Sequence, residues 1–330
     1  MRGIKILGTG EYLPETVVTN DDFSKIIETS NEWIESRTGI RERRFSAEKP
    51  NHEMAAEAAK EAVADSGVSP EEIDLILVST CSHEFFYPNA ACLVQEAIGA
   101  VNAAAYDINA ACTGFICAVD IASRYLEDGD YRNILIVASE RLSNHLDFED
   151  RASCVLFGDG AAAAVLTHSD KPFYSYLNAK GDPFRSLYCH INTKPNCPFQ
   201  GESTLGELLD TDKKRNYLQM DGRAVYKFAV DAMAAAMGRV LDKAGLSADD
   251  LDLVIPHQAN IRIIQSAMKL MKLPDEKVYI NIYDRANTSS VCIPTCLYEL
   301  KKAGRLKERM KICLVGFGAG LTSGAIIYET

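Results

Sequence analysis

An internal repeat with an offset of 178 residues restricts the fold of this chain more than any other feature. Residues 58–77 read AAKEAVADSGVSPEEIDLIL, and residues 236–255 read AMGRVLDKAGLSADDLDLVI. Each copy contains an amphipathic helix, a glycine that ends it, an acidic turn that begins at serine, and an apolar strand. Gly67 aligns with Gly245, and the residues that follow keep the same register.

The same offset returns in two later elements. The apolar segment 133–137 aligns with 311–315, and the predicted helix 112–127 aligns with 290–305. The strands are continuously apolar, as is typical of a sheet that is covered on both faces. A constant offset over several element types predicts a duplicated α/β unit with a long period.

The duplication divides the chain into two predicted halves, 1–172 and 173–330. Residues 181–219 break the pattern, because Pro, Asn, Asp and Gly are scattered through them. We expect this segment to be an insertion in the second half, forming a loop or cap at the rim of a functional site.

Composition excludes several classes of function. The chain has 35 Lys plus Arg against 46 Asp plus Glu, a formal charge of −11, so a nucleic-acid partner is not expected. No apolar run approaches the roughly 20 residues that a membrane helix needs. The 10 cysteines are scattered without a CxxC pair, which favours reduced thiols in the cytoplasm and no metal site.

Three side chains stand where chemistry is expected. Cys112 begins the helix 112–127, where the helix dipole favours a thiolate. His257 follows Pro256 at the end of an apolar strand, the position where α/β sheets gather their sites; the other five histidines are expected at the surface or at caps. Asn287 precedes the helix that mirrors the Cys112 helix, so the duplication predicts that both loops face one cavity.

The glycine-rich segment 316–320 supplies a fourth element. A strand follows it rather than a helix, so it does not fit a dinucleotide-binding loop. We expect a tight turn that directs backbone N–H groups at a developing oxyanion. A thiol nucleophile, a neutral histidine, an asparagine and backbone donors together predict an enzyme that exchanges thioesters.

These residues resemble β-ketoacyl-acyl-carrier-protein synthase III, a family of the thiolase superfamily. The resemblance covers six ordered blocks over nearly the whole chain: TSNEWIESRTGIRERR at 29–44, DINAACTGF at 107–115, DRASCVLFGDGAAAAVL at 150–166, PHQANIRII at 256–264, NTSSVCIP at 287–294 and FGAGLTSGA at 317–325. It implies a duplicated, thiolase-like αβαβα five-layer fold and a homodimer.

The resemblance also implies a mechanism. Cys112, His257 and Asn287 would form the catalytic triad, and Cys112 would accept an acyl group from acyl-CoA. Malonyl-acyl-carrier protein would then lose carbon dioxide, and its carbanion would attack the acyl-Cys112 thioester. The backbone N–H groups of Cys112 and Ala319 would form the oxyanion hole. Acyl-CoA is a substrate here, and no cofactor is expected.

Binding roles follow from the same resemblance. The six residues expected to contact CoA are Thr29, Trp33, Arg37, Arg151, Gly222 and Asn260. The residues expected to line the acyl pocket are Tyr87, which would reach across the dimer, Leu142 and Phe157. The basic residues expected to receive the acidic carrier protein are Lys227, Arg262 and Lys269. The alternatives are a half-buried core role for Trp33 and an ordinary charged helix face for the basic residues.

Three departures from the family pattern leave the substrate open. The loop before Asn287 reads Asp284-Arg285-Ala286 instead of ending in Tyr-Gly, Cys292 replaces a smaller residue, and the insertion reshapes the expected cavity mouth. A ketosynthase III-like enzyme or acyltransferase of secondary metabolism, using unusual acyl thioesters, is therefore the alternative.

Two further readings are disfavoured. A 3-hydroxy-3-methylglutaryl-CoA synthase needs a glutamate where this chain has Cys81. A catalytically inactive module that binds carrier protein would not need an intact triad.

Overall fold

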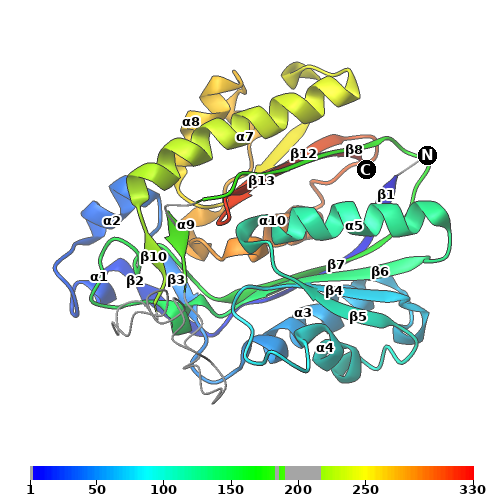
Figure 1. Ribbon diagram of the computed structural model, residues 1–330, viewed down its shortest axis with the longest axis horizontal. Coiled ribbons are helices and arrows are strands. Elements are labelled where there is room, and N and C mark those ends of the chain that lie inside the picture. The colour runs from blue at the N-terminus through cyan, green and yellow to red at the C-terminus, as the bar shows by residue number, and fades with distance from the viewer. Residues whose placement is uncertain (1–2, 183–185, 190–216) are drawn as a thin grey trace, which may run out of the picture.

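The computed structural model describes residues 3–182, 186–189 and 217–330. Its helices and sheets stack in five layers, helix, sheet, helix, sheet and helix, from top to bottom of Figure 1. This arrangement confirms the predicted duplicated α/β fold. The described part holds two large sheets, one built from strands before residue 172 and the other from strands after it.

The first large sheet has five strands. Their order is β1 (Ile4–Tyr12), β7 (Gly160–His168), β6 (Asn133–Glu140), β4 (Leu75–Ser79) and β5 (Ala104–Ile108). β4 lies parallel to β5 and β6, whereas β7 is antiparallel to β1 and β6. The carboxyl ends of β4 and β6 therefore meet at one edge of the sheet.

The second large sheet repeats this plan with four strands. Their order is β11 (Leu253–Pro256), β12 (Lys311–Gly318), β13 (Thr322–Glu329) and β8 (Phe173–Ala179). β11 is parallel to β12, and β13 is antiparallel to both of its neighbours. β12 begins and ends 178 positions after β6, so the repeat seen in the sequence is a repeat of the strands.

The middle layer contains two helices that the duplication relates. The 3-10 turn η2 (Ala111–Thr113) leads into α5 (Gly114–Asp128), and η7 (Ser289–Val291) leads into α10 (Cys292–Lys302). Apolar side chains of both helices join one core with both sheets. These two helices are therefore covered on two faces, which explains why most residues in their first halves are buried.

Two pairs of helices cover the outer faces. The first sheet is covered by α3 (Asn51–Ser66) and α4 (Ala90–Ile98), and the second by α7 (Gly222–Ala244) and α8 (Ile261–Leu270). The alanines of α3 allow a close approach to β1: a Cβ on Gly10 would lie 2.2 Å from the Ala58 carbonyl oxygen.

Shorter elements connect the strands and helices of these layers. They are β2 (Thr16–Thr19), α1 (Asn20–Phe23), α2 (Asn31–Thr38), β3 (Glu42–Phe45), α9 (Ile282–Arg285), the pair β9 (Leu187–Tyr188) and β10 (Gln219–Met220), and the 3-10 turns η1 (Pro70–Glu72), η3 (Leu142–His145), η5 (Ala248–Asp250) and η6 (Asp275–Lys277). β9 and β10 are the described ends of the predicted insertion and pair antiparallel. Residues 183–185 and 190–216 of the insertion lie outside the described residues.

Two classes of site are missing from the described residues. None of their helices is both long and apolar enough to cross a membrane. Their His, Cys, Asp and Glu side chains form no group of three that could hold a metal ion.

Candidate active site

The site lies where the two middle-layer helices begin. Ala111 in η2 has φ 46° and Ser289 in η7 has φ 54°, a left-handed conformation that non-glycine residues rarely adopt. The two residues stand 178 positions apart, so the duplication preserves the same strained turn in both halves. Both residues border one chamber with Cys112, which confirms that the two loops face a common cavity.

Cys112 is the second residue of η2. The residue as a whole is partly exposed to a neighbouring chamber, but its thiol group is surrounded by protein. Burial raises the pKa of the Cys112 thiol to about 12, although the nearby Ser289 hydroxyl acts in the opposite direction. The start of the helix favours a thiolate, whereas burial of the site acts in the opposite direction and favours the neutral thiol.

His257 follows β11 and is almost fully buried. Its backbone N–H donates to the Val315 carbonyl at 2.8 Å, and its ring packs edge-on against Phe317 with 5.4 Å between centroids. Neither ring nitrogen has a hydrogen-bond partner within the described part of the chain. Burial lowers the pKa of His257 to about 3, so the imidazole is neutral at physiological pH. A neutral imidazole offers one N–H donor and one acceptor.

Hydrogen bonds fix both the backbone and the side chain of Asn287. Its backbone N–H donates to the Leu156 carbonyl at 3.0 Å, and the Gly158 N–H donates to the Asn287 carbonyl at 3.1 Å. The Ser289 N–H donates to the side-chain Oδ1 at 2.9 Å. Because Oδ1 is occupied, the Nδ2 amide is left as the donor that can meet a ligand.

A cavity of about 220 Å³ joins these three side chains to the surface. Its walls contain the whole predicted triad and five of the six residues predicted to contact CoA: Trp33, Arg37, Arg151, Gly222 and Asn260. Thr29, the sixth, does not line the cavity. The cavity therefore connects an aromatic and basic mouth to a buried thiol.

Trp33 forms the centre of that mouth. The guanidinium carbon of Arg37 lies 4.6 Å from the Trp33 ring centroid, and that of Arg151 lies 4.5 Å from it. Arg151 also donates to the Glu28 carbonyl at 2.7 Å. The two guanidinium groups are thus held beside one aromatic ring, an arrangement that suits a ligand with both a planar base and phosphates.

The start of α8 fixes the same mouth. Asn260 caps α8 through Oδ1, and its Nδ2 donates to the Arg37 carbonyl at 3.1 Å. Arg262, predicted to dock the carrier protein, donates to the Ser36 carbonyl at 2.7 Å and so ties α8 to α2. Lys227 on α7 and Lys269 on α8 are exposed. The three residues lie on the two helices of one outer layer.

A second cavity, of about 470 Å³, opens from the other side of Cys112. Leu142 and Phe157 line it, as predicted for the acyl pocket. Tyr87 does not: its residue is 87 % exposed in the single chain, and Phe86 borders the cavity instead. Leu187 and Leu218, from the described ends of the insertion, also line this acyl chamber.

Sequence reasoning missed the polar residues of the acyl chamber. His83 and His145 line it, contrary to the expectation that the other histidines lie at the surface or at caps. His145 Nδ1 lies 3.8 Å from the Cys189 sulfur. The only signal in the sequence was position, since His83 follows strand β4 closely and His145 lies just beyond β6.

The glycine-rich turn approaches Cys112 through its backbone. A Cβ on Gly318 would lie 2.9 Å from the Cys112 nitrogen, so only glycine allows this approach. Ala319, the next residue, lines the acyl chamber together with Cys112.

The loop before Asn287 has a strained backbone at Ala286. Ala286 has φ 58° and ψ −163°, a region that is essentially reserved for glycine. Ala286 is fully buried, and Ile40 and Ile282 share its apolar cluster. The loss of the family's glycine therefore has not removed the glycine-like backbone that positions Asn287.

Comparisons with known proteins agree with this geometry. A family model described as 3-oxoacyl-[acyl-carrier-protein] synthase III matches residues 106–181. A second model, described as the C-terminal part of the same family, matches residues 241–330. The β-ketoacyl-[acyl-carrier-protein] synthase III of Clostridium acetobutylicum is 45% identical over 331 residues, covering 100% of this chain and 99% of the relative.

Solved structures extend the similarity to three dimensions. The 3-oxoacyl-[acyl-carrier-protein] synthase III of Aquifex aeolicus is 41% identical, with a TM-score of 0.90 over 99% of this chain and 100% of that one. The priming β-ketosynthase of the R1128 polyketide pathway is 34% identical, with a TM-score of 0.87 over 99% and 97% of the two chains.

Replacing Ala286 by glycine tests the strain in the Asn287 loop. The substitution removes about 1–3 kcal/mol of backbone strain and loses one buried methyl group. We expect the free energy of unfolding in urea to stay the same or to rise by about 1 kcal/mol. Ala236→Gly in α7, equally buried but helical, is the matched control and should lower it by about 1–2 kcal/mol. Equal losses in both variants would contradict a strained Ala286.

The raised pKa of Cys112 predicts how its alkylation depends on pH. With a pKa of about 12, the thiolate fraction grows tenfold for each pH unit between 7 and 9. The rate of iodoacetamide labelling at Cys112, followed by peptide mass spectrometry, should rise accordingly, with the exposed Cys92 as an internal reference for reagent access. A labelling rate that levels off below pH 8 would show a thiolate–imidazolium pair and contradict the neutral site.

Proposed function

The chain belongs to the 3-oxoacyl-[acyl-carrier-protein] synthase III family, and we propose that Cys112, His257 and Asn287 carry its initiating condensation of fatty acid synthesis. One observation carries this assignment: a single cavity brings the buried thiol, the neutral imidazole and the free amide donor together behind a mouth of Trp33 and two arginines. The next steps follow from the chemistry of these groups.

In the first step, Cys112 accepts the acyl primer from acyl-CoA. The Cys112 sulfur attacks the thioester carbonyl, a new thioester forms on Cys112, and CoA leaves as its thiolate. Arg37 and Arg151 pair with phosphates of CoA through their planar forks, and Trp33 stacks on the adenine. Gly222 and Asn260 complete this mouth, and Thr29 lies outside it.

In the second step, malonyl-acyl-carrier protein enters by the same mouth. His257 and Asn287 each donate one hydrogen bond to the oxygen of the malonyl thioester. These donors stabilise the enolate that forms when carbon dioxide leaves. A neutral His257 suits this role, because it supplies an N–H without adding a charge that solvent would have to balance.

The carbanion then attacks the acyl-Cys112 carbonyl. The backbone N–H groups of Cys112 and Ala319 hold the oxyanion of this tetrahedral intermediate. The close approach of Gly318 to the Cys112 nitrogen supports this assignment, because it brings the turn that contains Ala319 next to the Cys112 turn. Collapse of the intermediate releases β-ketoacyl-acyl-carrier protein and the Cys112 thiolate.

Lys227, Arg262 and Lys269 receive the acidic carrier protein on the outer layer formed by α7 and α8. All three are exposed on α7 and α8, and the first residues of α8 help to build the mouth. Arg262 has a structural role as well, because its guanidinium already binds α2.

The acyl chamber determines which primer is accepted. In the single chain its volume of about 470 Å³ exceeds what an acetyl group requires, which favours primers longer or bulkier than acetyl. The 45% identity to a β-ketoacyl-[acyl-carrier-protein] synthase III favours primary metabolism over a role like that of the 34% identical priming ketosynthase of a polyketide pathway. The range of acyl-CoA primers that load Cys112 separates these two roles.

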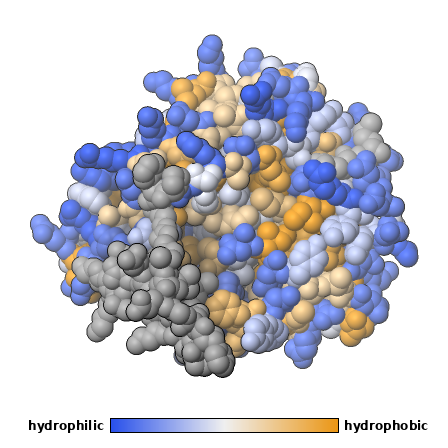
Figure 2. All heavy atoms as spheres, in the orientation of Figure 1, coloured by the Kyte–Doolittle hydropathy of each residue, from blue (hydrophilic) through white to orange (hydrophobic). Residues whose placement is uncertain are grey.

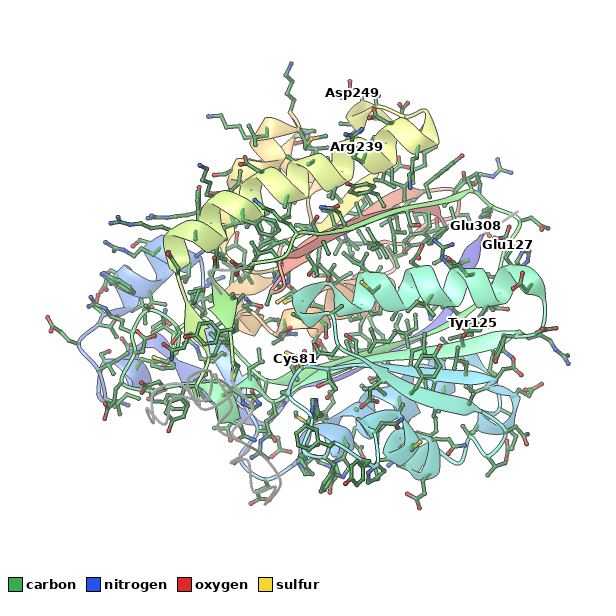
Figure 3. The ribbon with its side chains drawn as sticks, viewed as in Figure 1. Cys81, Tyr125, Glu127, Arg239, Asp249 and Glu308 are labelled. Carbon is green, nitrogen blue, oxygen red and sulfur yellow. The ribbon has the colours of Figure 1, made fainter. Side chains whose placement is uncertain are left out.

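The enzyme acts as a homodimer in the cytoplasm. β5 is an edge strand of the first sheet, and the aromatic segment Phe85–Tyr87 nearby is exposed. Apolar atoms gather across the middle of the face shown in Figure 2, and Figure 3 shows Tyr125 near the C-terminal end of α5. A second copy would cover an open sheet edge and these apolar side chains. A reducing compartment is supported by eight free thiols among the described residues: Cys81, Cys92, Cys112, Cys117, Cys154, Cys292, Cys296 and Cys313.

Intact-mass spectrometry after incubation with acyl-CoA tests the assignment of the nucleophile. An acyl adduct should appear on the wild-type chain and be absent from Cys112→Ala. Malonyl-acyl-carrier protein should discharge the adduct with release of carbon dioxide, and a panel from acetyl to decanoyl, branched and aromatic primers should give adducts beyond acetyl. An adduct that persists in Cys112→Ala would overturn the assignment.

A charge reversal on the docking surface provides the control for this experiment. Lys227→Glu should load acyl-CoA at the wild-type rate but discharge more slowly with malonyl-acyl-carrier protein, because only the second partner is a protein. If Lys227→Glu keeps the wild-type rate in both loading and discharge, Lys227 is not part of the docking surface.

Sedimentation velocity tests the dimer. The wild-type chain should sediment as a dimer at micromolar concentration, and Tyr87→Asp should weaken the association at least tenfold by burying a carboxylate in the interface. Leu270→Asp, at another exposed apolar position, on α8, should leave the dimer intact. A wild-type monomer, or equal effects of both variants, would exclude the proposed interface.

A further inference from the structure

Glu299 on α10 contacts residues that lead to both hydrogen-bond donors of the site, and the mechanism above does not use it. Its Oε2 accepts hydrogen bonds from the Tyr279 hydroxyl and from Asn281 Nδ2, each at 2.9 Å. Its Oε1 lies 3.0 Å from Nη2 of Arg285, two residues before Asn287. These partners stand just before the short helix α9 and at its last residue, so one carboxylate holds both ends of α9.

The segment before α9 fixes the loop of His257. The Asn281 N–H donates to Gln258 Oε1 at 3.1 Å, and Gln258 Nε2 donates to the Pro256 carbonyl at 2.7 Å. Gln258 is fully buried. Pro256 and Gln258 flank His257, so the segment that Glu299 holds also fixes the backbone that presents the imidazole.

The last residue of α9, Arg285, is held by carboxylates from two other elements. Its Nη2 lies 3.0 Å from Glu299 Oε1, and its Nε lies 3.8 Å from Oε1 of Glu11 on β1. The exposed Asp284 adds a third contact, at 3.3 Å from Nη1. Only 18% of the Arg285 side chain and 9% of the Glu11 side chain are exposed. Solvent screens partly buried charges less than exposed ones, so these pairs restrain Arg285 more than surface ion pairs would.

The loop that follows α9 needs such a restraint. Ala286 has the glycine-like backbone described above, and a strained backbone persists only where the surrounding structure holds it. A Cβ on Gly158 would lie 3.0 Å from the Arg285 carbonyl oxygen, so the loop also packs closely on a neighbouring turn. Arg285 stands directly before Ala286, where the family pattern has a tyrosine before its glycine. In this chain a charged anchor therefore replaces the tyrosine next to the position where alanine replaces the glycine.

The decarboxylation proposed above requires that His257 and Asn287 direct two donors at one thioester oxygen. A displacement of about 1 Å in such a group can cost about 100-fold in rate. We propose that Arg285 and Glu299 are positioning residues for this step, because they hold the two donor loops in a fixed relation through α9. Neither side chain lines the cavities that meet at Cys112, so the loading of Cys112 does not depend on them. This inference rests on the condensation proposed above.

Separate measurement of the two half-reactions tests this role. Arg285→Met keeps a long apolar side chain and removes the charge. Its kcat for release of carbon dioxide from malonyl-acyl-carrier protein should fall about 10–100-fold, with KM changed less than about threefold, because the donors act mainly on the enolate. Acyl-Cys112 formation, followed by rapid quench and mass spectrometry, should stay within about twofold of the wild type. Arg285→Lys can still pair with one carboxylate and should decarboxylate at least about fivefold faster than Arg285→Met.

Double substitutions show whether Arg285 acts through Asn287. In an Asn287→Ala enzyme, Arg285→Met should change the decarboxylation rate by less than about twofold, because the donor that it positions is gone. Glu299→Gln should slow decarboxylation in the wild type and should still slow it in Asn287→Ala, because Glu299 also fixes the loop of His257. Multiplicative effects of Arg285→Met and Asn287→Ala, or a wild-type rate for Glu299→Gln, would overturn the proposal.

Lys301→Met is the matched control for an ion pair lost from the same helix. Lys301 follows Glu299 by two residues and pairs with Asp65 on α3, with 29% of its side chain exposed. This variant should keep wild-type rates in both half-reactions, even where it unfolds at a lower urea concentration. Equal losses of loading and decarboxylation in Arg285→Met, or the same loss in Lys301→Met, would leave Arg285 a stabilising role only and would overturn the proposal. A wild-type chain that neither loads nor decarboxylates would instead overturn the proposed function.

Discussion

The thiol of Cys112 and the imidazole of His257 lie between two sheets, where the surrounding protein disfavours a charge on either group. That desolvation raises the pKa of the thiol and lowers the pKa of the imidazole, so both groups rest in their neutral forms. Every later feature of the site follows from this constraint. Donors must be N–H groups rather than cations, the oxyanion must be held by backbone, and a proton that leaves sulfur needs a defined acceptor. Charged groups are kept at the mouth, where Arg37 and Arg151 remain accessible to solvent and to phosphates.

The duplicated architecture supplies the geometry. Two 3-10 turns, one in each half, lead into the paired helices of the middle layer and meet at the same point. One turn has become the nucleophile turn, with Cys112 after the strained Ala111. The other has become the donor turn, with Asn287 before the strained Ser289. Strain in both turns is supported by the packed helices behind them, which a single unduplicated unit could not cover on two faces.

Much of this could be predicted from sequence, for identifiable reasons. A constant offset revealed the duplication, and the position of Cys112, His257 and Asn287 at element ends indicated one cavity. The ionisation state of Cys112 could not be predicted, because the helix-start argument says nothing about how deeply the second half buries the thiol. His83 and His145 were missed, since their place in the chamber depends on how loops after different strands fold together. Ala286 shows the opposite case: its sequence departure was visible, but the structure was needed to show that the glycine-like backbone persists.

Nitrogen-15 NMR of the protein labelled at histidine measures the central claim directly. The chemical shifts of the two ring nitrogens distinguish a neutral imidazole from an imidazolium, and His257→Gln identifies the resonances. The account predicts that His257 remains neutral from pH 5 to pH 8, both in the free enzyme and in the acyl-Cys112 form. An imidazolium signal for His257 near neutral pH, lost when Cys112 is replaced by alanine, would contradict it and would show that the site works as an ion pair.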